Sequence, residues 1–163
     1  MKEFLKAIID NDSKKVVSLL KSDSSLTNFI FEKDLLYEGQ INHWIYNGDT
    51  ALHLAAAGHR FKIIQTLLSN GVGPNSKANR RHSTPLHYAA DGYINRSAWD
   101  PKAQVKSIKI LIDAGANIND KDNNGATPLH RAVRTRCAAA VKSLLELDSD
   151  PNLKNNSGST PFH

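Results

Sequence analysis

The sequence is poor in cysteine, in aromatic residues and in long apolar runs, and each shortage excludes a class of protein. Cys137 is the single cysteine, so no internal disulfide can form and the fold needs no oxidising compartment. No apolar run is long enough to span a membrane, and charged residues interrupt the first segment where a signal peptide would lie. We therefore expect a cytoplasmic protein that makes no membrane contact.

Motifs of catalysis and cofactor binding are also missing. The chain has no glycine-rich phosphate loop, no cysteine and histidine cluster with zinc-ligand spacing, and no nucleophile motif. We expect no enzyme activity, no cofactor and no metal. Among the 163 residues, 40% are hydrophobic and 23% are charged, which is typical of a folded globular protein. The net charge of +5 favours an acidic partner but is too small to indicate nucleic acid.

A repeated pattern fills most of the chain. Four tetrapeptides align, with their histidines 34, 43 and 33 residues apart: Thr50-Ala-Leu-His53, Thr84-Pro-Leu-His87, Thr127-Pro-Leu-His130 and Thr160-Pro-Phe-His163. In step with them, apolar residues spaced i, i+3, i+4 share one helix face: Val16/Leu19/Leu20, Ile64/Leu67/Leu68, Ile108/Leu111/Ile112 and Val141/Leu144/Leu145. Each unit is predicted to be a short helix, a tight turn, a longer helix and a loop.

The ends of these predicted helices carry suitable residues. Threonine is a good N-cap, and the proline that follows it fits the first helical turn. Gly71 and Gly115 supply the left-handed residue after the longer helix, and Asp148 stands at the same place in the last unit. We expect Asp148 to adopt the left-handed conformation, which aspartate tolerates less well than glycine.

This unit resembles the ankyrin repeat, whose period is about 33 residues. The resemblance implies an all-α solenoid of stacked helix-turn-helix units with projecting hairpin-like loops. It also implies protein binding as the usual role, with no shared enzymatic activity. The motif residues would make structural hydrogen bonds within and between repeats; they are Thr50, His53, Thr84, His87, Thr127 and His130. Residues 127–145 are also similar to uncharacterised bacterial members of the family.

A single array is predicted to span residues 1–163. Its parts are a degenerate first helix pair at 2–21, an apolar-rich inserted loop at 22–49, repeats at 50–83, 84–126 (with a 10-residue insertion) and 127–159, and the start of a truncated further repeat at 160–163. No capping unit follows, so the face that includes Val133, Val141 and Leu144 is expected to be poorly covered. Such a face would allow end-to-end self-association.

The two insertions contain both tryptophans, Trp44 and Trp99. In a regular stack the first insertion lies with the projecting loops and the second lies at the opposite edge, so we do not expect them to form one site. Two interpretations stay open for each insertion: extra packing that covers apolar surface, or an aromatic anchor for a partner. The density of apolar residues in the first insertion predicts that it is ordered and packed on the stack.

Basic residues gather on the surface that the resemblance makes concave, although a merely solvated face remains an alternative. We expect an acidic protein partner to dock there, on loop tips, short helices and aromatic side chains. The predicted partner-binding residues are Lys77, Arg80, Arg81, Tyr88, Lys121, Arg131, Arg134, Trp44 and Tyr46. Only Asp91 and Asp122 are expected to be acidic on this surface. His43, His59 and His82 are expected in solvated positions, and Cys137 as a buried or half-buried thiol.

Two other functions remain open. A nucleic-acid-binding protein would need a continuous basic stripe with aromatic residues on it, whereas the aromatic residues here cluster in the insertions. The chain would alternatively be the targeting domain of a longer enzyme or effector, including one delivered into the cytosol of a host cell.

Overall fold

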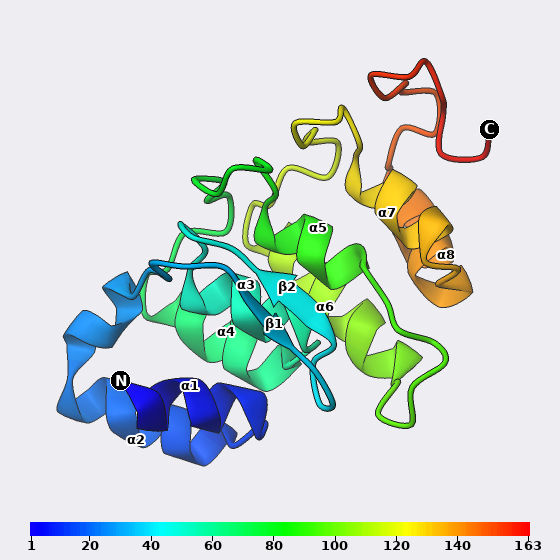
Figure 1. Cartoon of the computed structure of the whole chain (residues 1–163). Helices are drawn as coiled ribbons and strands as arrows, with labels where there is room; N and C mark the ends of the chain where they lie inside the picture. Colours follow the sequence, from blue (N-terminus) through cyan, green and yellow to red (C-terminus); the bar gives the residue numbers. More distant parts are fainter.

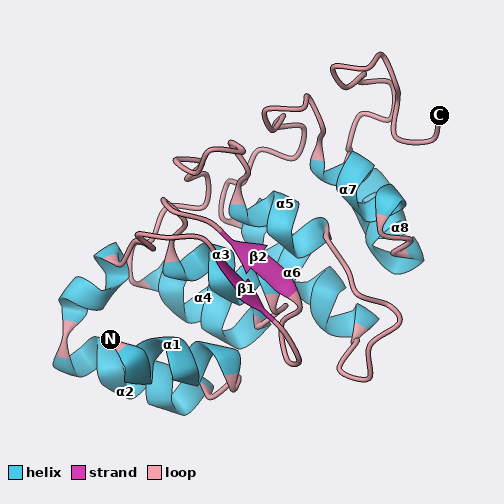
Figure 2. Ribbon diagram, viewed as in Figure 1, coloured by secondary structure: helices cyan, strands magenta, loops and turns pink.

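The computed structural model describes all of residues 1–163 and consists mainly of four successive helix pairs (Figures 1 and 2). A 3₁₀ helix, η1, and a two-stranded hairpin lie between the first and second pairs. The bounds are α1 Lys2–Ile9, α2 Ser13–Ser22, η1 Ser24–Asn28, β1 Leu35–Tyr37, β2 His43–Ile45, α3 Ala51–Ala57, α4 Phe61–Ser69, α5 Pro85–Ala90, α6 Pro101–Asp113, α7 Pro128–Arg134 and α8 Ala138–Glu146.

The helices stack in two rows. The first helices of the pairs, α1, α3, α5 and α7, each contact the next in the series, and α2, α4, α6 and α8 form a parallel row behind them. The loops that follow α4, α6 and α8 project from one side of the stack, and the two termini lie at its opposite ends (Figure 1). This is the predicted all-α solenoid with projecting loops.

Three of the four pairs are closed by a tight turn that requires one left-handed residue, whereas the second insertion joins α5 to α6. The three short turns place Asn11 (φ 57°), His59 (φ 54°) and Arg136 (φ 61°) at the same position. Small residues after the turn and along the first helices allow close packing, and Ala55, Ala56 and their neighbours in α3 are fully buried. Asp148 has φ 72°, so the expected left-handed conformation is confirmed.

The first insertion forms a β-hairpin, which the sequence analysis did not predict. Strand β1 pairs antiparallel with β2, placing Leu36 opposite Trp44 and Tyr37 opposite His43. Successive side chains in a strand point to opposite faces. Ile45 is therefore buried against the stack, while Leu36 and Trp44 are 46% and 47% exposed on the outer face. The hairpin packs on α3 through β2, as the apolar composition of the insertion predicts.

The second insertion occupies residues 92–100 and leads into α6, whose 13 residues exceed the 9 of α4. It packs tightly on the start of α8. The backbone of Gly92 lies so close to Cys137 that a Cβ atom at this position would be 2.1 Å from Cys137 Sγ. His59 lies between Tyr93 and Trp99, with ring centroids 5.8 and 5.6 Å away. The expectation of a solvated His59 is therefore wrong, because the insertion covers it and only 4% of it is exposed.

The last pair is better packed than the sequence predicts. Leu144 is fully buried, so the expectation that it lies on an uncovered face is wrong; it faces the core because α8 packs on α6. Val133 and Val141 are half-buried, and Leu145 is 38% exposed. Residues 160–163 form a turn, in which the backbone N–H of His163 donates to the carbonyl of Thr160 at 3.1 Å. Cys137 is buried, within the expected range.

Candidate functional site

The repeated threonine and histidine pairs are structural. In each short helix the threonine hydroxyl accepts from the backbone N–H of the histidine, and histidine Nδ1 accepts from the backbone N–H of the threonine. The opposite ring nitrogen, Nε2, donates to the carbonyl of the residue just before the next repeat, as from His53 to Ser83 and from His87 to Ala126, both at 2.9 Å. These bonds tie neighbouring repeats together, as the resemblance implied.

The neutral form of these histidines suits their buried sites. Burial lowers the pKa of His87 to about 4, because a charged ring would lose its hydration. Burial likewise lowers the pKa of His53. Since Nδ1 of each accepts a hydrogen bond, protonation there would also break the cap.

Asp49 is a fully buried carboxylate that joins the hairpin to two repeats. Its Oδ2 accepts from the backbone N–H of Tyr46 at 2.8 Å and from the hydroxyl of Tyr88 at 2.6 Å. Its Oδ1 accepts from Asn79 Nδ2 at 2.7 Å. A buried carboxylate needs such donors to offset its lost hydration. Tyr88 is committed to this network and is 1% exposed, so the prediction that it gives apolar contact to a partner is wrong.

Asp91 connects the two insertions. Its carboxylate accepts from Arg131 in a two-pronged pair, with Nε 2.9 Å from Oδ1, and from His43 Nε2 at 2.7 Å. Burial alone would raise the pKa of Asp91, but the Arg131 guanidinium and His43 hold it well below its usual range. Because His43 lies on β2 and Asp91 immediately precedes the second insertion, whose Gly92 lines the same cavity, the expectation that the insertions form no common site is wrong. His43 is correspondingly largely covered and not solvated.

Arg131 is held in place for its contact with Asp91 by further hydrogen bonds. Its guanidinium also donates to Asp122 Oδ2 at 3.2 Å and to Ser83 Oγ at 3.1 Å. Burial alone would lower the pKa of Arg131, but the two carboxylates raise it. It is 5% exposed, and the prediction that it presents its charge to a partner is wrong because that charge is used inside the protein.

The basic residues at the loop tips are partly neutralised. Lys77 Nζ lies 2.8 Å from Asp120, and Arg80 lies 2.9 Å from Asp34. The expectation that only Asp91 and Asp122 are acidic here is thus wrong, since the hairpin and a loop tip add two more carboxylates. Lys121 Nζ donates to the Lys154 carbonyl at 2.9 Å, with no carboxylate partner.

A cavity of about 260 Å³ opens between the hairpin and the short helices, and we call it the hairpin cavity. It gathers Trp44, Arg81 and Arg134 from the predicted set, and its floor includes the buried Tyr46, Tyr88 and Arg131. Its lining residues are Leu36, Asn42, His43, Trp44, Tyr46, Arg81, Ser83, Tyr88, Asp91, Gly92, Arg131, Arg134 and Thr135. Lys77, Arg80 and Lys121 lie outside it on the loop tips.

Sequence reasoning missed Leu36 and His43 as parts of this cavity. Both lie in three-residue strands that are too short to show a clear alternation. The structure shows what marks the cavity: the apolar side chains of Leu36 and Trp44 lie directly opposite each other in the hairpin and remain exposed.

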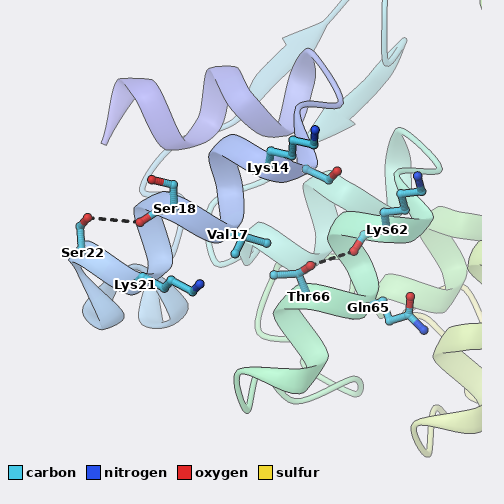
Figure 3. Close-up of a pocket in the computed structure, with 9 residues that line it drawn as sticks. Lys14, Val17, Ser18, Lys21, Ser22, Lys62, Gln65 and Thr66 are labelled. Atoms are coloured by element: carbon cyan, nitrogen blue, oxygen red, sulfur yellow. Dashed lines mark hydrogen bonds between the residues drawn. The ribbon is translucent and has the colours of Figure 1, made fainter.

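A second groove lies on the other side of the stack, between α2 and α4 (Figure 3). It has a volume of about 650 Å³ and is lined by Lys14, Lys21 and Lys62 with Val17 as its one apolar residue. Its hydroxyl groups are used locally, as in the bond from Thr66 Oγ1 to the Lys62 carbonyl at 3.0 Å. The groove is basic but has no aromatic or arginine side chain, so substitutions of its lysines are suitable controls for a change of net charge.

Comparison with known protein families shows which repeat family the sequence matches. Residues 4–97 match the family profile described as ankyrin repeats in three copies, and residues 111–163 match that of ankyrin repeats in many copies. A single ankyrin repeat matches residues 81–123. The chain belongs to the ankyrin-repeat family. Ankyrin repeats are non-catalytic modules of protein–protein interaction, so a protein partner is implied.

Similar ankyrin-containing sequences come from proteins that are much longer than this chain. Alpha-latrotoxin-Lhe1a of Latrodectus hesperus is 34% identical over 61% of the chain, and the match spans 6% of the toxin. A probable serine/threonine-protein kinase of Dictyostelium discoideum is 30% identical over 85% of the chain, which spans 12% of the kinase. Rabankyrin-5 of Mus musculus is 28% identical over 66% of the chain, which spans 12% of that protein.

Two further observations bear on the ankyrin array. None of its helices combines the length and the apolar character that crossing a membrane requires. No group of three or more histidine, cysteine, aspartate or glutamate side chains is arranged to hold a metal ion.

Proposed function

We propose that this protein is a non-enzymatic interaction module that binds an acidic segment of a partner protein on its concave face. The hairpin cavity supports the proposal, because it combines two arginines with an exposed tryptophan. The Arg134 side chain is 61% exposed and Trp44 is 47% exposed. Aromatic residues and arginine supply much of the affinity at protein interfaces, while complementary charge accelerates association.

The proposed surface extends from the cavity to the loop tips. Lys77, Arg80 and Lys121 would add longer-range attraction, reduced by the carboxylates that already pair with the first two. Arg81 lies at the junction, because its NH1 donates to the Tyr46 hydroxyl at 3.2 Å. Tyr46 itself is 8% exposed and would act mainly by holding Arg80 and Arg81 over its ring, at 4.9 and 5.7 Å.

The location in the cytosol, of the producing cell or of a host cell, is part of the same proposal. Cys137 is a free thiol, which suits a reducing compartment. A nucleic-acid partner is the second candidate, but the charged surface here is broken by Asp34 and Asp120.

The test is a charge-reversal comparison. Wild-type protein, the Arg81→Glu/Arg134→Glu variant and the Lys14→Glu/Lys21→Glu variant are immobilised and exposed to native cytosol, with and without nuclease treatment. Captured proteins are identified by mass spectrometry. The two variants change net charge equally, but only the first alters the concave face. We expect one acidic partner to be retained by the wild type and the lysine variant and lost by the arginine variant.

Association kinetics then decide the mechanism. With the captured partner purified, reversal of Arg81 and Arg134 should slow association and flatten its dependence on salt, with folding intact by circular dichroism. Equal rates for wild type and the arginine variant would place the site elsewhere, and loss of capture after nuclease treatment would favour nucleic acid.

A further inference from the structure

The hairpin cavity continues into a second hollow, which we call the arginine hollow. It has a volume of about 350 Å³ and lies between the second insertion and the α7–α8 turn. The two hollows share Gly92, Arg134 and Thr135, so they form one continuous depression. The lining residues of the arginine hollow are Gly92, Tyr93, Ile94, Asn95, Arg96, Arg134, Thr135 and Arg136.

The positive charge of this hollow is only partly compensated. Three arginines line it and no acidic residue does. No ion pair of the chain includes Arg96 or Arg136. Arg134 lies 3.6 Å from Asp91, a carboxylate that already binds Arg131 and His43. Three guanidinium groups around one small space repel one another unless an anion enters.

Arg136 occupies the left-handed position that the turn between α7 and α8 requires. Arg136 has φ 61°, and the equivalent position of the first pair holds Asn11, a residue that tolerates this conformation better. The Arg136 side chain is exposed and forms no hydrogen bond within the protein that would offset this cost. The Arg136 guanidinium lines the hollow without a partner inside the protein, so it is available to contact a ligand there.

We propose that the arginine hollow binds a phosphorylated side chain of the partner segment that occupies the hairpin cavity. This inference rests on the proposed function. A phosphate group carries nearly two negative charges and three acceptor oxygens, and the guanidinium forks of arginine fit such oxygens in pairs. A single carboxylate would leave most of the three positive charges unbalanced.

The shape of the depression favours a polypeptide. Exposed apolar residues mark its course, with Leu36 and Trp44 beside the hairpin cavity and Ile94, 39% exposed, in the arginine hollow. A phosphorylated segment can place its acidic and apolar residues along this path and its phosphate at the end. A lipid headgroup would fill only the arginine hollow.

The first experiment uses inorganic phosphate as the probe. Titration at pH 7.5 is followed by the arginine Nε–H resonances in NMR spectra of the wild type, the Arg96→Gln/Arg136→Gln variant and the Lys14→Gln/Lys62→Gln variant. We expect saturable shifts of Arg96, Arg134 and Arg136 in the wild type and lysine variant, with affinity reduced about tenfold or more in the arginine variant. Arg134 is present in all three proteins, and an equal phosphate affinity from its resonance in each of them would overturn the proposal.

The second experiment separates binding from packing. Arg136→Asn removes the charge and relaxes the backbone, so its midpoint of thermal unfolding should equal or exceed that of the wild type while phosphate affinity falls about tenfold. A fall in both thermal midpoint and affinity would mean that Arg136 is structural, and unchanged affinity would exclude it from the site. Either result overturns the proposal.

The third experiment distinguishes this inference from the proposed function. A synthetic glutamate-rich peptide containing one phosphoserine is compared with the same peptide containing serine. We expect both to bind in a manner that depends on Arg81, and the phosphopeptide to bind about tenfold more tightly in a manner that also depends on Arg96 and Arg136. Equal affinities overturn the phosphate site and leave the proposed function standing. If neither peptide binds, both fail. Binding of phosphatidylserine vesicles without binding of the phosphopeptide would assign the hollow to a membrane.

Discussion

At the scale of single residues, the backbone places strict demands on a few positions. Asp148 adopts φ 72° where Gly71 and Gly115 have φ 91° and 101°. An L-residue with a side chain is strained in this region, whereas glycine is not. The sequence allowed this feature to be predicted, because the three repeats can be aligned residue by residue at the end of the second helix.

Asp148→Gly should therefore raise the free energy of unfolding by up to about 1 kcal/mol, as the relief of strain outweighs the extra freedom of the unfolded chain. Urea denaturation of the variant and the wild type provides the measurement. The reverse change, Gly71→Asp, is the matched control and should lower stability, since Gly71 has open space around it but a positive φ. A loss of stability in Asp148→Gly would contradict the expectation.

Buried histidines make stability depend on pH. Burial lowers the pKa of both His59 and His87 to about 4, against about 6.5 in the unfolded chain. Their contribution is fully present above pH 6.5 and is lost as pH falls from there towards 4, because the unfolded state takes up the protons first.

The loss is on the order of 3 kcal/mol for each of these histidines, by the linkage between pKa and stability. Urea denaturation at pH 7 and pH 4.5 should show it, and NMR titration should find His59 and His87 neutral at pH 5. A constant free energy of unfolding between these two pH values would disprove the assignment.

At the scale of elements, the helices were predictable and the hairpin was not. The Thr-x-Leu-His capping pattern and the apolar triads each act within one helix, so the sequence shows them directly. Strands β1 and β2 contain three residues each, and their pairing depends on packing against α3. The burial of Tyr88 and Arg131 could not be predicted either, because the hairpin that lies beside them was not recognised in the sequence.

The buried Asp91 contact should matter far more than an exposed pair. Asp91→Asn leaves the Arg131 guanidinium buried without full compensation and should destabilise the fold by about 3 kcal/mol. Asp34→Asn removes the partner of Arg80, a pair in which the arginine side chain is 69% exposed, and should change stability little because solvent screens the pair.

Urea denaturation of these two variants gives the comparison. Hydrogen exchange should in addition show faster exchange of residues 35–45 in Asp91→Asn, because the hairpin loses its contact through His43. Similar costs for the two variants would mean that the Asp91 network adds nothing beyond an ordinary surface pair.

The second insertion fits closely against α8. Gly92→Ala would place its Cβ 2.1 Å from Cys137 Sγ and 2.9 Å from the Trp99 ring, so it should destabilise by about 1–3 kcal/mol. Gly73→Ala meets no atom within 4 Å and should be neutral or slightly stabilising. Adding Cys137→Ala to Gly92→Ala should recover part of the loss in a thermal unfolding measurement. Additive effects of the two changes would show that the contact is not the cause.

At the scale of the whole molecule, the architecture was predictable and the binding surface only in part. Repeat spacing indicated the stack, and Arg81, Arg134 and Trp44 do line one cavity. Ion pairs such as those of Lys77 and Arg80 join residues more than 40 positions apart, which spacing alone does not reveal. The contribution of the second insertion was missed because a regular stack would place it at the far edge.

End-to-end association of the array remains a proposal. Leu145 and Phe162 are 38% and 56% exposed near the end of the stack and offer apolar contact to a second copy. Sedimentation velocity at increasing concentration should then show a dimer that Leu145→Glu weakens. Lys142→Glu, on the same helix, is the control for added negative charge, and a monomer at all concentrations would refute the proposal.

The contact between His43 and Asp91 also affects how the molecule comes apart. In a regular solenoid each repeat touches only its neighbours, so the ends can unravel one unit at a time. Here one carboxylate joins a strand that precedes α3 to a guanidinium on α7, across sequence separations of 48 and 40 residues. We therefore expect that opening the last helix pair exposes Asp91 and loosens the hairpin over α3 and α5, so that the central units lose their structure together instead of in sequence.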